Sequence, residues 1–108
     1  SDAFYHMAAK MIQLKSYYEL EETEALLSLL EASRKYIKRN RQLSAYQKQS
    51  NGSFLKMAGK LHKLRMRAPQ LKRRDRQQQA AALSMELEAL PAVTNKSWLR
   101  EKIGALES

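Results

Sequence analysis

The chain has 108 residues and a formal net charge of +9, a length that suits one domain with a single modest core. It contains no cysteine, which excludes disulfides, thiolate zinc sites and cysteine nucleophiles. No apolar run is long enough to span a bilayer and no signal-peptide pattern opens the chain, so we expect a cytoplasmic protein without a transmembrane segment.

Helix-forming residues dominate the composition. There are only three glycines and two prolines, and the β-branched residues that a sheet needs are scarce, with one Val, two Thr and three Ile. The sequence therefore predicts an all-α fold of about five helices, arranged as stacked antiparallel hairpins or as an irregular helical bundle.

The first two predicted helices cover residues 2–18 and 23–40, where apolar side chains recur every three or four residues. Between them lies an acidic cluster that suits a tight turn. We expect Thr23 to cap the second helix, and Asn40 to end it in a left-handed conformation.

The turn and second helix of this pair, YYELEETEALLSLLEA at residues 17–32, resemble a tetratricopeptide-type helical hairpin over about residues 3–40. The repeat's small and bulky positions are matched by Ala8, Ala25, Leu29 and Ala32. The whole chain also resembles C-terminal helical regions of large uncharacterised bacterial repeat proteins. We expect residues 1–108 to form a single all-helical domain that is the C-terminal part of a longer chain. The resemblance implies a scaffold built for stacking and supplies no active site.

The remaining helices are predicted at residues 44–67 and 69–90, followed by a last helix that Thr94 or Asn95 caps. Pro69 marks the boundary between the first two of these helices, because it disfavours helical geometry at the residue before it and suits a first helical position.

Catalytic and metal-binding patterns are missing from the chain. His6 and His62 lie far apart without metal-ligand spacing, and we interpret them as surface or half-buried histidines. The carboxylates of residues 19–24 suit a helix start. No phosphate-binding loop, nucleophile elbow or dinucleotide fingerprint is present. We therefore expect no enzyme, no cofactor and no metal.

The net charge is concentrated in residues 33–76, which hold fifteen basic side chains and one acidic side chain. Spacings of four, three and four residues place the first group of cations on one helix stripe. A second group follows across the Pro69 turn, and we expect the two groups to share a surface. The candidate residues are Lys56, Lys60, Lys63, Arg67, Lys72, Arg73, Arg74 and Arg76.

Two interpretations of this basic surface stay open. It is a solvated face that meets an acidic partner or the acidic segment of residues 19–31, or it binds nucleic acid or another polyanion through residues 56–76. No aromatic side chains interleave with the cations as base-stacking platforms would.

The tyrosines also allow two interpretations, core packing with the hydroxyl at the rim, which we favour, or the lining of a peptide groove. These residues are Tyr17, Tyr18, Tyr36 and Tyr46.

Taken together, the pattern favours a noncatalytic protein–protein interaction or scaffold module, whose partner is another protein, the remainder of the parent chain or a second copy. Nucleic-acid binding is the alternative.

Overall fold

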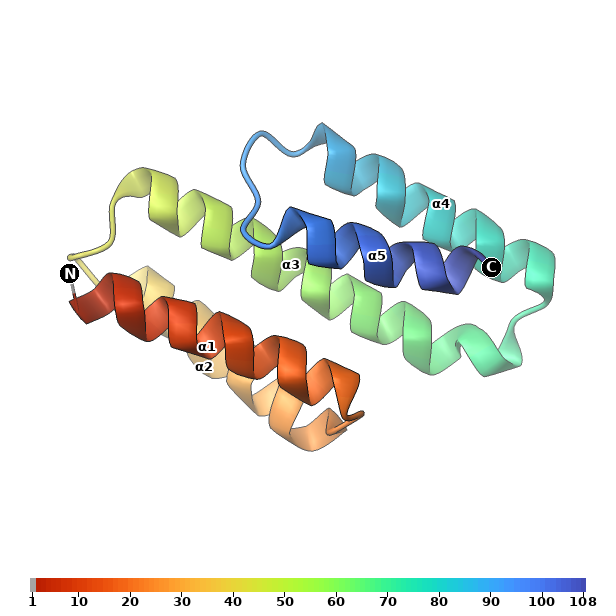
Figure 1. Ribbon diagram of the computed structural model, residues 1–108, viewed down its shortest axis with the longest axis horizontal. Helices are drawn as coiled ribbons and strands as arrows, with labels where there is room; N and C mark the ends of the chain where they lie inside the picture. The colour runs from red at the N-terminus through yellow and green to blue at the C-terminus, as the bar shows by residue number, and fades with distance from the viewer. Residues whose placement is uncertain (1) are drawn as a thin grey trace.

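The computed structural model describes residues 2–108, and within that range it contains five α-helices and no strand (Figure 1). The all-α prediction is thus confirmed. The helices are α1 (Asp2–Glu19), α2 (Thr23–Arg39), α3 (Ala45–Arg67), α4 (Arg73–Ala89) and α5 (Lys96–Glu107), with a 3₁₀ turn at Ala68–Gln70.

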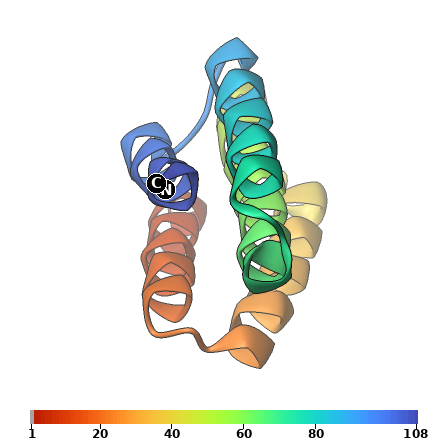
Figure 2. The same cartoon turned by 90° about the vertical axis from the view of Figure 1, so that its right-hand side faces the viewer.

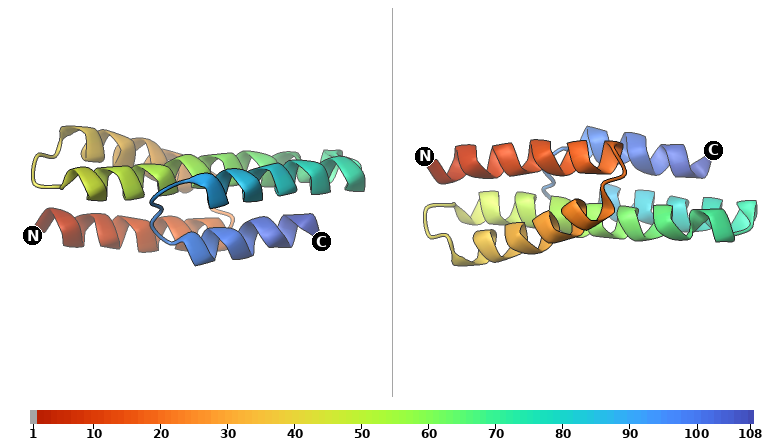
Figure 3. Two further views of the ribbon diagram at one scale, coloured as in Figure 1. Left: turned by 90° about the horizontal axis from the view of Figure 1, so that it is seen from above. Right: turned by 90° about the horizontal axis from the view of Figure 1, so that it is seen from below.

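The five helices form two layers. Helices α2, α3 and α4 lie side by side in one layer, with the long α3 in the middle (Figures 1 and 2). Helices α1 and α5 make up the other layer and follow each other along the long axis of the molecule (Figure 3). Each helix runs antiparallel to the one before it, so α1 with α2 and α4 with α5 are antiparallel hairpins that share α3.

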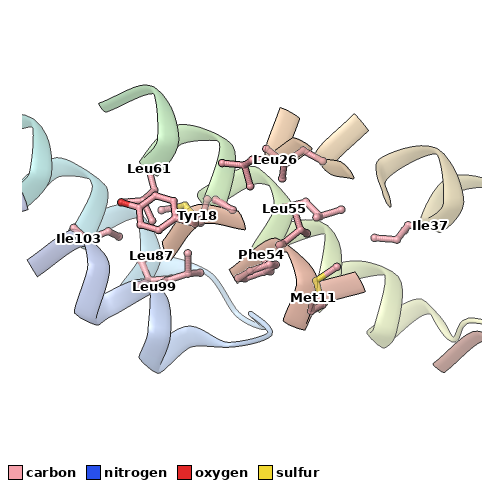
Figure 4. Packing of buried hydrophobic residues seen from close by; sticks show 14 of the residues in the cluster. Met11, Tyr18, Leu26, Ile37, Phe54, Leu55, Leu61, Leu87, Leu99 and Ile103 are labelled. Carbon is pink, nitrogen blue, oxygen red and sulfur yellow. The ribbon is translucent and has the colours of Figure 1, made fainter. Parts of the chain in front are cut away.

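The core lies between the two layers and receives side chains from every helix. Phe54 of α3 is fully buried, and Figure 4 shows it among side chains from the other four helices, including Met11, Leu26, Leu87 and Leu99. Because the apolar stripe of each helix is covered in this way, burial stabilises the fold by roughly 25 cal/mol per Å² of apolar surface removed from water.

Helix α3 begins at a capping box. The Ser44 hydroxyl accepts a hydrogen bond from the Gln47 backbone N–H at 3.1 Å, and the Gln47 side-chain oxygen accepts one from the Ser44 N–H at 2.9 Å. Two otherwise unpaired backbone donors are satisfied reciprocally. The helix then runs unbroken to Arg67 and places one face against the core and the opposite face toward solvent.

Two predicted helix caps are wrong in detail, and a third, at Asn95, is confirmed in position only. Glu22, and not Thr23, is the N-cap of α2, and it makes no side-chain cap bond. Asn40 is extended, with φ −88° and ψ 118°, because its side-chain oxygen instead accepts a hydrogen bond from the Gln42 N–H at 2.8 Å. Asn95 occupies the N-cap of α5 in a left-handed conformation without a cap bond, since its side chain accepts from Lys15 of α1.

The predicted start of the fourth helix at Pro69 is also wrong. Pro69 lies in the short 3₁₀ turn, and Leu71 and Lys72 are extended before α4 begins at Arg73. The predicted boundary between the third and fourth helices is confirmed, and the extra turn separates the two groups of cations that the sequence placed together.

The C-terminal end of α1 is joined to α3 and α5 by polar and aromatic contacts. The ring of Trp98 packs edge-on against the ring of Tyr18, with 5.3 Å between centroids. The Glu19 carboxylate accepts hydrogen bonds from the Trp98 indole at 3.2 Å and from Lys102 at 2.6 Å. These contacts join the two hairpins directly, from α1 to α5.

Candidate interaction surface

A surface that we call the basic face lies on the side of the α2–α3–α4 layer that points away from α1 and α5. Its grooves are lined only by residues of α2, α3 and α4. It carries five cationic side chains, four from α3 and one from α2, namely Arg34, Lys56, Lys60, Lys63 and Arg67. The α3 side chains form a ridge, since positions separated by three or four residues project from one helix face.

The α2/α3 groove runs along one side of this ridge. It is lined by Leu27, Leu30, Arg34, Lys56, Gly59, Lys60 and Lys63. Its volume is about 300 Å³ and it is open to solvent, so it suits one or two protruding side chains better than an enclosed small molecule. Four of the seven lining residues are cationic and none is acidic.

The floor of the α2/α3 groove is apolar. Leu30 is buried, whereas the apolar side chain of Leu27 leaves that residue 48% exposed to solvent. Gly59 leaves room for Arg34, because a Cβ at this position would lie 3.0 Å from Arg34 Nη2. Within residues 2–108, neither Arg34 nor Lys63 has a hydrogen-bond or ion-pair partner for its charged group. The groove thus combines an apolar floor with uncompensated positive charge.

The α3/α4 groove on the other side of the ridge is electrostatically different. It is lined by Lys60, Lys63, Leu64, Arg67, Gln79, Ala82, Leu83 and Glu86. Lys60 Nζ lies 2.8 Å from both carboxylate oxygens of Glu86, and Lys56 Nζ lies 3.8 Å from one of them. Arg67 donates a hydrogen bond to Gln79 at 2.9 Å. A carboxylate of the chain itself therefore already occupies this side.

The structure brings together only part of the predicted surface. Lys56, Lys60, Lys63 and Arg67 share the α3 ridge, whereas the second group of cations lines neither groove. Lys72 precedes α4, and Arg73 and Arg74 are exposed in its first turn.

Arg76 makes the expectation of one shared surface wrong. Its guanidinium donates to the backbone carbonyl of Leu106 at 2.9 Å and to that of Ser108, both at the end of α5. It therefore stabilises the C-terminal end of α5, on the opposite side of α4 from the basic face. The 3₁₀ turn and the extended residues after it change the rotation of α4 relative to α3, which a continuous helical count cannot anticipate.

Sequence reasoning missed Arg34, Leu27 and Glu86 as members of this surface. Arg34 and Leu27 lie on α2, seven residues apart and thus on one helix face, but no local pattern shows that this face borders α3. Glu86 follows Lys60 by 26 residues. Its helical spacing from Gln79 and Ala82, which places the three residues on one face of the fourth helix, was the only available signal for it.

The acidic segment is not the partner of the basic residues within the chain. Glu19 pairs with Lys102, Glu31 pairs with Lys35 at 3.4 Å, and among residues 2–108 no ion pair joins residues 19–31 to residues 56–76. The hydrogen bond from Lys102, aided by the one from Trp98, holds the pKa of the Glu19 carboxyl below its usual value. The intramolecular version of the acidic-partner hypothesis is therefore wrong.

The two histidines differ in environment. His6 is exposed and packs on the ring of Tyr36 with 4.7 Å between centroids. His62 is only 4% exposed, more buried than the sequence suggested, and its Nδ1 has no hydrogen-bond partner. Burial, together with the charge of Arg65, lowers the pKa of the His62 imidazole. In the part of the chain that the structure describes, no group of three His, Asp or Glu side chains could hold a metal ion.

The tyrosines divide between the two interpretations. Tyr18 is buried in the core, and Tyr17 and Tyr36 pack against its edge. Tyr46 is 67% exposed, so core packing is wrong for that residue. Tyr46 borders a third groove beside α1, and none of the four tyrosines lines the grooves of the basic face.

The basic face offers electrostatic attraction through its cations and apolar contact through its leucines.

None of the helices in residues 2–108 has the length and apolar character needed to cross a membrane. The chain matches no protein-family model, no curated protein and no solved structure. Any functional conclusion therefore rests on the geometry of the surface itself.

Proposed function

We propose that this protein is a noncatalytic protein–protein interaction module and that its basic face docks an acidic segment of a partner protein. The observation that carries this proposal is the α2/α3 groove, where Arg34 and Lys63 present unpaired charge beside an exposed leucine. Cations of this kind accelerate encounter with an acidic partner, and apolar contact then slows its dissociation.

The geometry of Glu86 supports a carboxylate-bearing partner. Lys60 holds both Glu86 oxygens at 2.8 Å and Lys56 is within 3.8 Å of the same carboxylate. The α3 lysines are thus spaced so that two of them can approach one carboxylate. In the α2/α3 groove Lys56 and Lys60 already face Glu86, but Arg34 and Lys63 have no internal carboxylate among residues 2–108, so an incoming Glu or Asp side chain finds uncompensated cations there.

Nucleic-acid binding remains the second candidate, favoured by the five cations of the basic face and by exposed Lys72, Arg73 and Arg74 nearby in sequence. Two features count against it. The grooves contain no aromatic residue on which bases could stack, and Glu86 places negative charge beside the ridge, where a phosphate backbone would have to lie.

The test compares two labelled probes of opposite class, poly-L-glutamate and a generic DNA duplex, by fluorescence anisotropy over a range of salt concentrations. The charge-reversed variant carries Lys56→Glu with Lys63→Glu. Its matched control carries Arg39→Glu with Arg41→Glu, exposed residues at the end of α2 that line neither groove. Both variants change the net charge by the same amount.

Polyglutamate binding that is lost in the first variant and retained in the control supports an acidic protein partner on the basic face. Tighter binding of DNA, with a steep loss of affinity as salt rises, would move the conclusion to the nucleic-acid candidate. Absence of binding to both probes at low salt would contradict the proposed function.

A scaffold role in a longer repeat chain rests on a different surface and on the resemblance to tetratricopeptide hairpins. Along α1, Phe4, Ala8 and Ile12 are exposed at four-residue spacing, and Phe4 and Ile12 keep about half or more of their surface in water. This stripe is where a neighbouring hairpin of a parent chain, or a second copy, would pack. Ile12→Glu should abolish any concentration-dependent self-association seen by analytical ultracentrifugation; if wild type and variant behave alike, the stripe is not an interface.

A further inference from the structure

We infer that the partner segment is an amphipathic acidic helix that lies in the α2/α3 groove, with its apolar stripe on the groove floor and its carboxylates on the rim. This inference rests on the proposed function and specifies the chemistry of the partner. The alternatives that the experiment must separate are an unstructured acidic chain, a nucleic acid and a second copy of this protein.

The α2/α3 groove sets apolar surface beside positive charge. Leu27 and Leu30 form its apolar part, the Arg34 guanidinium lies over Gly59, where a Cβ would stand 3.0 Å from Nη2, and Lys56 and Lys63 stand on the α3 side. A helix with a leucine stripe flanked by glutamates presents the complementary order. A purely acidic chain would leave the floor uncovered, since it has no apolar side chain to place there.

The lysines on the α3 side of the groove have the length and register of one helix face. Lys56, Lys60 and Lys63 follow the i, i+4, i+7 spacing of one helix face, which extends over about 10 Å at 1.5 Å per residue. Lys60 already holds Glu86, so glutamates one turn or two apart on an incoming helix would meet Lys56 and Lys63, of which Lys63 has no internal partner among residues 2–108.

The two grooves that flank the α3 ridge differ in whether their cations are already paired. In the α3/α4 groove, Glu86 already accepts the Lys60 ammonium at 2.8 Å. In the α2/α3 groove, Arg34 and Lys63 have no such partner within residues 2–108. Charge complementarity therefore directs the acidic helix to the α2/α3 side.

The two helical glycines of α3 provide a matched pair of variants. Gly59→Leu fills the groove floor, and its Cβ needs only the end of the flexible Arg34 side chain to shift. Gly52→Leu is the control, because a Cβ there meets nothing within 4 Å and Gly52 lines neither groove of the basic face. Leucine is a better helix former than glycine, so both variants should fold.

The probes are two labelled peptides of identical composition, one with leucines at i and i+4 flanked by glutamates, the other with the same residues scrambled, and poly-L-glutamate as reference. We expect the patterned peptide to bind at least tenfold more tightly than the scrambled peptide. Gly59→Leu should reduce its affinity about tenfold, while Gly52→Leu should leave it within twofold. Polyglutamate binding depends on the cations, so it should stay within about twofold in Gly52→Leu. Gly59→Leu shifts the Arg34 side chain but keeps its charge, so polyglutamate binding should fall by less than that of the patterned peptide.

A second variant tests the floor without filling it. Leu27→Ser removes exposed apolar surface that a bound helix would cover. Because about half of Leu27 is exposed in the free protein, the variant should bind the patterned peptide about fivefold more weakly. Leu20→Ser, on the exposed α1–α2 turn, is its control and should have no effect.

The outcomes separate the inference from the proposed function. If polyglutamate binds but the patterned and scrambled peptides are equivalent, or if Gly59→Leu has no effect on the patterned peptide, the amphipathic helix is wrong and the acidic partner stands. If neither polyglutamate nor either peptide binds, the proposed function fails first. Self-association that Gly59→Leu abolishes would assign the groove to a second copy and overturn the inference.

Discussion

The guanidinium of Arg65 lies 3.5 Å from the centroid of the Tyr18 ring and donates a hydrogen bond of 2.8 Å to the Tyr18 backbone carbonyl. One side chain of α3 thus donates to a backbone carbonyl at the end of α1 and packs on the ring of Tyr18, the last buried residue of that helix. Arg65 follows Lys63 by two residues, yet it points to the side of α3 opposite the basic face. A basic residue in this segment can therefore be structural.

Replacement of Arg65 by leucine removes both the cation–π contact and the charged hydrogen bond, and we expect a loss of about 2 kcal/mol in the free energy of unfolding. Urea denaturation followed by circular dichroism measures it. Arg39→Leu, at an exposed position of α2, should change stability by less than about 0.5 kcal/mol. Equal effects of the two substitutions would contradict the structural role of Arg65.

Burial of His62 makes stability depend on pH. The pKa of the His62 imidazole is lowered in the folded state, so the unfolded chain binds a proton first as pH falls below about 6.5. Stability is therefore full above that pH and declines as pH falls toward the folded-state pKa. Urea unfolding at a series of pH values from 8 to about 5, in which most carboxyl groups remain ionised, should show this decline.

The control for this prediction is the other histidine. His62→Phe should flatten the dependence of stability on pH between about 7 and 5, if the variant retains the helical content of the wild type. His6→Gln, at an exposed site, should leave the dependence unchanged. A slope that persists in His62→Phe and disappears in His6→Gln would show that the responsible histidine has been misassigned.

The ion pair between Glu19 and Lys102 joins α1 to α5 at 2.6 Å. A double-mutant cycle with Glu19→Gln and Lys102→Gln should give a coupling energy of about 0.5–1 kcal/mol, since the pair is partly exposed. The lowered pKa of Glu19 means that the contribution is present above its unfolded-state pKa and is lost as pH falls through its folded-state pKa. If the effects of the two substitutions on the free energy of unfolding simply add at neutral pH, this ion pair does not couple the two hairpins.

Glu21 adopts a left-handed backbone conformation, with φ 56°, in the turn between α1 and α2. A residue with a side chain loses about 1 kcal/mol or more of stability when its backbone is left-handed. Glycine adopts this conformation freely, but it loses more backbone entropy on folding. We expect Glu21→Gly to stabilise the protein by about 0.5 kcal/mol in thermal or urea unfolding. Glu22→Gly, where φ is −83°, gains no such relief and should destabilise it.

The sequence predicted what depends on local pattern. The apolar periodicity of the helices and the break at Pro69 are encoded within a few residues, and the structure has helices and a helix boundary where these signals predict them. What the sequence could not supply depends on long-range packing. Thr94, expected as a cap, instead donates a hydrogen bond to Asn51 at 2.8 Å, which fixes the α4–α5 loop on α3.

For the candidate surface, too, the sequence revealed the local spacing of the residues but not their long-range packing. The stripe of Lys56, Lys60, Lys63 and Arg67 follows from helical spacing alone, but its neighbours depend on which helices flank α3. Arg34 joins the surface because α2 runs antiparallel beside Gly59, and Arg76 leaves it because α4 turns that side chain toward the end of α5. The contribution of these residues to binding remains a prediction.

Titration of ¹⁵N-labelled protein with poly-L-glutamate, followed through the backbone amide resonances, shows whether the basic face is the docking surface. We expect the largest shifts on residues 56–67 of α3 and 27–34 of α2, with little change at residues 38–41 and 72–76. Shifts that are absent, or that are spread evenly over all the basic residues of the chain, would contradict it.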